Sequence, residues 1–105
     1  MAWTIEYTKQ ADSDLTIFGH SQKIQILKAI VKVSNNPLQN TKGGYGKPLG
    51  NNLTGFFKIK LKKLGIRVSY RIVYEREIMR VVIISIRADE QVYKLLQDRI
   101  KKGQI

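Results

Sequence analysis

Cysteine is absent from the 105-residue chain, and histidine occurs once, at His20. The lack of cysteine excludes a disulfide-stapled scaffold, a thiolate metal site and a cysteine nucleophile. A single histidine makes a histidine metal cluster or a Ser-His-Asp triad hard to build. The sequence has no apolar run near the ~20 residues that a membrane helix needs, and it lacks the apolar core of a signal peptide. We therefore expect one small cytoplasmic domain, residues 1–105.

Acidic residues are missing from the middle of the chain, where none lies between Asp14 and Glu75. Nineteen Lys and Arg against eight Asp and Glu give a net charge of +11. The flanking segments are balanced, so residues 15–74 carry the whole net charge, on eleven basic side chains: Lys23, Lys28, Lys32, Lys42, Lys47, Lys58, Lys60, Lys62, Lys63, Arg67 and Arg71.

A field of this sign and size favours a polyanionic partner. We expect that partner to be nucleic acid, and an acidic protein segment is compatible with it. A membrane surface is disfavoured, because no basic helix carries a bulky aromatic apolar face. The remaining alternative is that the positive charge serves only to keep the protein in solution.

The N-terminal third predicts a strand followed by two helices. Residues 2–7 alternate between apolar and polar side chains, which indicates a half-buried strand. Thr8 is placed to cap a short helix that stops at Gly19. Ser21 is placed to cap a second helix, which runs to about Ser34.

A linker, three strands and a last helix are expected to follow. Residues 36–52 are rich in Gly, Asn and Pro, which indicates a long linker. From Leu53 the apolar period becomes two, which predicts a meander of three antiparallel strands, the last over residues 78–87. Asp89 can cap the last helix. The order β-α-α-β-β-β-α predicts an α+β fold: a small, mostly antiparallel four-stranded sheet, two N-terminal helices packed on one face and a short C-terminal helix.

Four basic side chains alternate with apolar ones on two consecutive predicted strands: Lys58, Lys60, Arg67 and Arg71. Adjacent strands lie ~4.8 Å apart, and residues two apart on one strand ~6.6 Å, so the four can form one patch if the register permits. A fixed cluster of cations can hold a phosphate and the charge of its transition state. The alternative is the solvated face of an amphipathic sheet.

The tyrosines of the second half have simple packing interpretations. Tyr70 and Tyr74 share the apolar face of their strand, so we expect both to pack. Tyr93 precedes Leu96 and Ile100 by three and seven residues on the predicted last helix, so it can equally belong to the core.

The segment from Leu53 to Tyr74, with Lys-x-Lys followed by Gly-x-Arg-x-x-Tyr, resembles the RelE/ParE toxins of bacterial toxin–antitoxin systems, and most closely the RelE branch. The resemblance continues over residues 3–7 and 81–100, in the same element order. It implies a type II toxin that inhibits translation by cleaving mRNA in the ribosomal A site. The reaction it implies needs no metal or other cofactor: the RNA 2′-hydroxyl attacks phosphorus and leaves a 2′,3′-cyclic phosphate.

The resemblance also implies five catalytic residues. Lys58 and Lys60 match the active-site lysines of the family, and Arg67 matches its strand arginine. Tyr93 matches the C-terminal tyrosine. Arg87 matches a further arginine if this chain is two residues shorter before that tyrosine.

The roles of these residues follow from the charge that develops in the reaction. Arg67 and Arg87 are expected to neutralise the pentacoordinate phosphate. A general base must take the 2′-hydroxyl proton, and Tyr93 and a lysine both remain candidates. Lys60 can instead assist the leaving oxygen or simply bind phosphate.

Other residues are expected to contact RNA. Tyr45, in the glycine-rich linker, can stack on a base. The basic ones are Lys62, Arg71, Lys23, Lys28, Lys32 and Lys47. For the three lysines of the second helix, a solvated face is the alternative.

The resemblance implies a small antitoxin as protein partner, the ribosome and mRNA as targets, and operator DNA bound only through the antitoxin. Two other functions stay open: a ParE-type toxin that inhibits DNA gyrase, and a non-catalytic RNA-binding module. The combination of Lys58, Lys60 and Arg67 favours the nuclease, because the ParE branch generally lacks that set.

Overall fold

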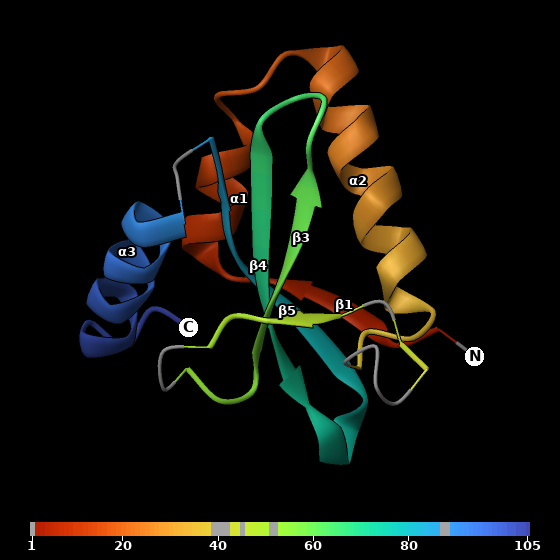
Figure 1. The fold of residues 1–105 in the computed structure, drawn as a ribbon, viewed down its shortest axis with the longest axis vertical. Coiled ribbons are helices and arrows are strands. Elements are labelled where there is room, and N and C mark those ends of the chain that lie inside the picture. Colours follow the sequence, from red (N-terminus) through yellow and green to blue (C-terminus); the bar gives the residue numbers. More distant parts are fainter. Residues whose placement is uncertain (1, 39–42, 45, 51–52, 87–88) are drawn as a thin grey trace.

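Five strands form one mixed sheet in the order β1-β5-β4-β3-β2. The computed structural model of the protein describes residues 2–38, 43–44, 46–50, 53–86 and 89–105. The strands are β1 (Thr4–Tyr7), β2 (Lys47–Pro48), β3 (Phe56–Leu61), β4 (Ile66–Val73) and β5 (Ile78–Ser85). The helices of the described part are α1 (Lys9–Leu15), α2 (His20–Ser34) and α3 (Asp89–Lys101), with a single 3₁₀ turn, η2 (Tyr74–Arg76). Figure 1 shows α2 beside β3 and α3 at the opposite side of the sheet.

The prediction of four strands was wrong, because β2 lies inside the segment predicted as a linker. It has only two residues, too few for any periodicity, and it pairs antiparallel with β3 through Lys47↔Lys58 and Pro48↔Phe57. Pro48 is tolerated there because β2 is an edge strand. The sheet is mostly antiparallel, as predicted, since of the described strand pairs only β1–β5 is parallel.

The two N-terminal helices begin at local capping signals. The Thr8 hydroxyl accepts a hydrogen bond from the Ala11 N–H at 3.1 Å, which confirms the predicted cap of α1. The predicted cap of α2 was wrong, because Gly19 takes that position and Ser21 lies in the first turn. The Gly19 N–H donates to the Gln22 side chain at 3.1 Å, so a side chain still satisfies the helix start.

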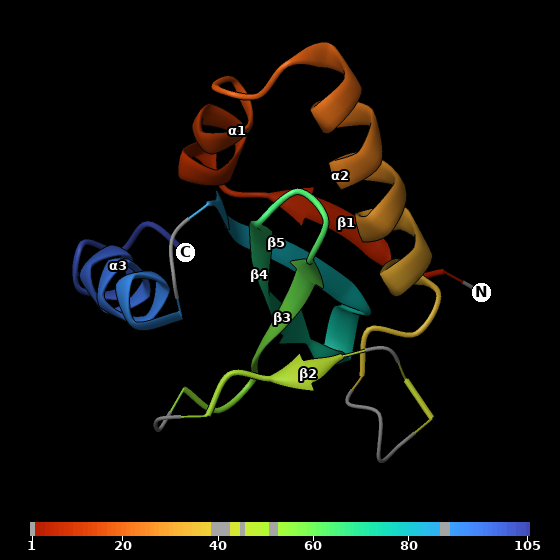
Figure 2. The ribbon, with the colours of Figure 1, turned by 45° about the horizontal axis from the view of Figure 1, so that its top comes forward.

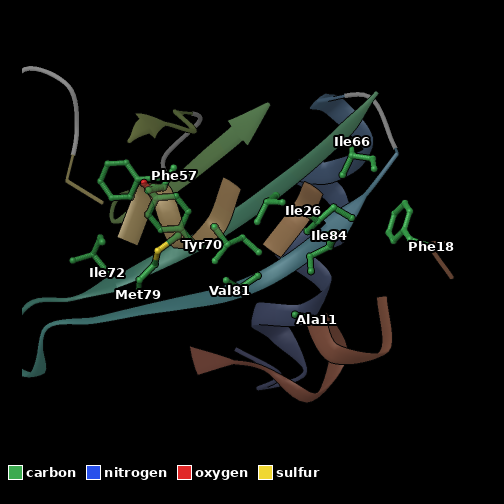
Figure 3. Close-up of a cluster of buried hydrophobic side chains, with 13 residues drawn as sticks. Ala11, Phe18, Ile26, Phe57, Ile66, Tyr70, Ile72, Met79, Val81 and Ile84 are labelled. Atoms are coloured by element: carbon green, nitrogen blue, oxygen red, sulfur yellow. The ribbon is translucent and has the colours of Figure 1, made fainter. Parts of the chain in front are cut away.

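One face of the sheet forms the main core with α1 and α2 (Figures 2 and 3). The rings of Phe57 and Tyr70 stack within this core, with centroids 5.6 Å apart. Tyr70 is fully buried, and its hydroxyl donates to the Pro37 carbonyl at 2.7 Å. Burial raises the pKa of the Tyr70 phenol above its ordinary value of 10.0.

A second, smaller core lies on the other face, beneath α3. Val92 and Leu96 of α3 cluster there with Val82 and Ile83 of β5 and with Phe56 of β3. The register between β4 and β5 shifts at Ser69/Tyr70, so Ser69 pairs with Ile83 and Tyr70 with Val81. Val82 is the extra residue, and this bulge lets two consecutive side chains join the second core.

A buried ion pair holds α3 against α1 and β5. Both guanidinium Nη atoms of Arg99 donate to the Asp14 carboxylate, at 2.8 and 2.9 Å, and Nη1 also donates to the Val82 carbonyl at 2.6 Å. The Ile84 N–H donates to the same carboxylate at 3.0 Å. No helix in the described segments combines the length and the apolar character needed to cross a membrane.

Candidate functional site

The hairpin register brings basic side chains of neighbouring strands face to face. Lys60 of β3 lies directly opposite Arg67 of β4, and both side chains are half-buried. Directly opposite residues have Cβ atoms about 4.5–5.5 Å apart. One step along β3, Lys58 lies opposite Ser69 on one side and opposite Lys47 of β2 on the other. The pairing therefore brings together three residues of the expected patch, Lys58, Lys60 and Arg67, and adds Lys47 to them.

Two shallow hollows meet at Lys60. The first has a volume of about 170 Å³, sits at the tip of the β3–β4 hairpin and is lined by Lys60, Leu61, Lys62, Gly65, Ile66 and Arg67. The second has a volume of about 280 Å³, runs between α2 and the edge of the sheet and is lined by Ala29, Lys32, Val33, Lys47, Lys58, Ile59, Lys60 and Leu61. Three elements far apart in sequence thus contribute lysines to one continuous basic edge.

The strand pairing places like charges directly opposite each other. Like charges directly opposite on neighbouring strands are destabilising, and the Lys47↔Lys58 and Lys60↔Arg67 pairs are of this kind. Among the described residues that line the two hollows, none is acidic. An anion placed there would remove the repulsion, so the geometry fits a bound phosphate.

Arg71 lines neither of the two hollows. It shares the strand face of Arg67 but lies four residues further along, about 13 Å away. Its neighbours across the sheet are Phe56 and Arg80, and Arg80 forms an ion pair with Glu6 at 3.2 Å. Lys58 pairs with Ser69, so Arg71 is a diagonal neighbour of Lys58, about 7–8 Å away, and its place in the expected patch stays a prediction.

The three lysines of α2 separate. Lys32 lines the groove beside β3, whereas Lys23 and Lys28 line neither hollow. Lys28 is exposed and Lys23 is half-buried. For these two residues the solvated helix face is the simpler interpretation.

Tyr93 is turned toward the segment that follows β2. Its hydroxyl donates to the Leu49 carbonyl at 2.8 Å, and its ring packs against the second core. It lines neither of the lysine hollows. This position ties α3 to the loop before β3, in keeping with the packing interpretation of Tyr93.

Two predicted site residues, Arg87 and Tyr45, lie outside the described residues. In sequence, Arg87 comes two positions after Ser85, the last residue of β5, which pairs with Arg67. Their predicted roles stay predictions.

The prediction that Tyr74 packs in the core was wrong. Tyr70 is buried as expected, but 55% of Tyr74 is exposed. The alternation of β4 ends at Val73, and Tyr74 begins the 3₁₀ turn η2, so the face of the strand no longer applies to it. Its ring meets that of Trp3 edge to face, with centroids 6.2 Å apart.

The chemistry available here is that of fixed positive charge. Lysine and arginine side chains can bind a phosphodiester and stabilise the extra charge of its transition state. Within the part of the chain that the structure describes, no three His, Asp or Glu side chains gather to hold a metal ion.

Residues 5–93 match the family described as the ParE toxin of the type II toxin–antitoxin system parDE. The chain belongs to this family. It is therefore a type II toxin of the RelE/ParE superfamily, as the sequence motifs predicted. No curated protein matches the toxin.

Solved structures share the fold of the toxin. A mutant of the E. coli toxin RelE in the free state matches with a TM-score of 0.77 at 23% identity, over 95% of this chain and 99% of that chain. The same mutant in complex with a peptide of the antitoxin RelB matches with a TM-score of 0.71 at 22% identity, over 91% and 95%. The toxin–antitoxin complex RelBE2 from Mycobacterium tuberculosis matches with a TM-score of 0.69 at 25% identity, over 83% and 100%.

The family description and the structural relatives point to different branches of the superfamily. The matched family bears the ParE description, whereas these three structures are of RelE toxins or RelBE complexes. At such identities the likeness establishes the fold. The activity must therefore be argued from the residues of the toxin itself.

Proposed function

We propose that this toxin is a metal-independent, ribosome-dependent endoribonuclease of the RelE type. It cleaves mRNA in the A site and so inhibits translation. The observation that carries the proposal is the pairing of Lys60 with Arg67 at the junction of two basic hollows, with Lys58 one step along the same face.

In the proposed reaction the RNA 2′-oxygen forms a bond to the adjacent phosphorus, and the bond from phosphorus to the 5′-oxygen breaks. The products are a 2′,3′-cyclic phosphate and a 5′-hydroxyl. Lys60 and Arg67 face the phosphate oxygens, on which negative charge grows in the transition state. One such donor is worth about 10²–10³ in rate. Arg87 is proposed as a further donor to the same oxygens.

A base must accept the 2′-hydroxyl proton, and an acid must protonate the leaving 5′-oxygen. We propose a lysine of the hollows, Lys58 or Lys60, for the proton transfers. Both line the groove, whereas the Tyr93 hydroxyl is engaged by the Leu49 carbonyl and would have to leave it to act as a base. The cleavage rates of Tyr93→Phe, Lys58→Met and Lys60→Met, measured side by side, distinguish a lysine from Tyr93 in these roles.

The proposed partners of the toxin are RNA and a small antitoxin protein. We propose that Lys32, Lys47 and Lys62 hold RNA on either side of the cleaved bond. A small antitoxin is proposed to neutralise the toxin, since related toxins are seen in complexes with RelB. Operator DNA would be reached only through that antitoxin.

The test is cleavage of mRNA on programmed bacterial ribosomes with an open A site, with ends mapped by primer extension. We expect A-site cuts by the wild type and a loss of about 10²-fold or more in rate for Arg67→Ala. Lys94→Ala is the control, because it removes one positive charge from an exposed position on α3. Naked mRNA is treated in parallel. A folded toxin that arrests growth but cuts neither substrate contradicts the proposal.

Inhibition of DNA gyrase is the second candidate, and the family description favours it. A supercoiling assay with purified gyrase separates the two. Inhibition of supercoiling by the wild type and equally by Arg67→Ala, with mRNA intact on ribosomes, would replace the nuclease by the gyrase inhibitor.

A further inference from the structure

A third hollow lies at the far end of β3 from Lys60. It has a volume of about 320 Å³ and is lined by Pro48, Gly50, Leu53, Thr54, Gly55, Phe56, Phe57 and Tyr74. Phe56 and Phe57 are buried, so the exposed ring of Tyr74 is the aromatic surface that a ligand can reach. Nothing in the proposed cleavage reaction uses this hollow.

The strand pairing joins this hollow to the basic groove. Phe56, Lys58 and Lys60 alternate on one face of β3. Pro48 and Phe57, which line the hollow, are paired, and the next pair along is Lys47 and Lys58, which line the groove. A chain of phosphates that follows the lysines of β3 therefore reaches the hollow within one or two residues of Lys58.

We propose that this hollow is a nucleobase subsite, in which an unpaired base of the bound RNA stacks on Tyr74. The proposal rests on the proposed function, because the RNA strand must first lie along the lysines. Single-stranded RNA is recognised through unstacked bases that pack on aromatic rings, and every base offers such a face. Among the described residues that line the basic groove, none is aromatic and none is an arginine.

Tyr74 can be replaced in a binding test without loss of the fold. It is more than half exposed, so its removal leaves both buried cores intact. Its contact with Trp3 also provides a reporter, because Trp3 is the single tryptophan of the chain and lies 6.2 Å away, centroid to centroid. A base that stacks on Tyr74 is expected to change the emission of Trp3.

The experiment uses end-labelled 2′-O-methyl RNA of six nucleotides, which the toxin cannot cleave because the attacking hydroxyl is blocked. Affinity is measured by fluorescence anisotropy for the wild type, Tyr74→Ala, Tyr74→Phe and Lys60→Ala. We expect Tyr74→Ala to weaken binding about 5- to 150-fold, the loss of one stacked base. Tyr74→Phe keeps the ring and is expected to bind like the wild type. A matched oligonucleotide with abasic sites should bind Tyr74→Ala and wild type equally, and should leave Trp3 emission unchanged.

The outcomes separate the subsite from the proposed function. If Lys60→Ala weakens binding while Tyr74→Ala does not, the subsite is wrong and the basic groove stands. Equal weakening of the normal and abasic oligonucleotides by Tyr74→Ala also overturns the subsite. If no oligonucleotide binds in a Lys60-dependent way, the subsite is overturned, whereas the proposed function is decided separately by A-site cleavage on ribosomes. Poly-glutamate is tested in the same way as RNA. If it changes Trp3 emission only when Tyr74 is present, and RNA causes no change, the subsite is overturned and the hollow binds an acidic peptide instead.

Discussion

Tyr70 shows how one buried residue links packing to pH. Its ring stacks on Phe57, and its hydroxyl satisfies the Pro37 carbonyl, so the neutral phenol is the form that the core accepts. Ionisation would place a charge in the main core and lose the donor of that bond. The raised pKa of Tyr70 records this preference for the protonated form.

We expect this preference to appear as alkaline destabilisation. Because the folded-state pKa lies above the unfolded value of about 10, the stabilisation is present in full below pH 10 and is lost as the pH rises further. Tyr70→Phe should cost about 1–3 kcal/mol at pH 7, since the Pro37 carbonyl is left unsatisfied. The free energy of unfolding of the Tyr70→Phe variant should then fall less than that of the wild type between about pH 9 and 11. Urea unfolding at several pH values measures the cost at pH 7 and the alkaline loss of stability. If the stabilities of the two proteins fall in parallel with pH, ionisation of Tyr70 does not cause the alkaline destabilisation.

At the scale of elements, the β-bulge and α3 together decide where the sheet stays open. The bulge turns Val82 and Ile83 toward α3, which covers the β5 side of the second face. The hairpin side of that face, with Lys60 and Arg67, stays accessible as a hollow. Lys60 and Arg67 therefore lie on the part of this face that α3 does not cover.

The ion pair between Asp14 and Arg99 is expected to hold α3 in this position. Arg99→Met leaves the carboxylate without its guanidinium, and removing one partner of a buried pair costs about 3–5 kcal/mol. The control is Lys102→Met, because Lys102 pairs with Asp98 at 3.1 Å with more than half of each side chain exposed. Such an exposed helical pair is worth about 0.3–0.5 kcal/mol. Urea unfolding compares Arg99→Met with Lys102→Met. A similar small loss of unfolding free energy for both variants would show that the buried pair does not stabilise the position of α3.

At the scale of the whole molecule, the excess charge is concentrated rather than spread. Residues 15–74 carry all of the +11, and folding brings lysines of α2, β2 and β3 to one edge of the sheet. A surface of this kind attracts polyanions over a distance set by ionic strength. Salt dependence is therefore the property that belongs to the molecule as a whole.

We expect the affinity for single-stranded RNA to fall steeply with salt. Each phosphate contact contributes about −0.7 to the slope of log affinity against log salt. Lys60→Ala should make the slope shallower by about that amount, whereas Lys94→Ala, at an exposed position of α3, should leave the slope unchanged. Anisotropy titrations between 50 and 200 mM salt, about the range in which such slopes are resolved, give the comparison. A flat affinity over this range would count against the basic edge as the binding surface.

The sequence by itself determined the features that depend on neighbouring residues. Alternation put Lys58 and Lys60 on one face of β3 and, separately, Arg67 and Arg71 on one face of β4, because side chains of a strand alternate whatever surrounds it. The Thr8 cap is local in the same way, and the family motif lay within these strands.

Only the tertiary structure decided what depends on pairing between distant segments. The register set Lys60 against Arg67 and left Arg71 beside Arg80, because register is fixed by the turn and by the bulge at Ser69/Tyr70. The two-residue strand β2 exists only through its partner β3. Tyr74 shares the odd–even pattern of Tyr70 and yet lies exposed, because the chain leaves the sheet at Val73 and the pattern stops there.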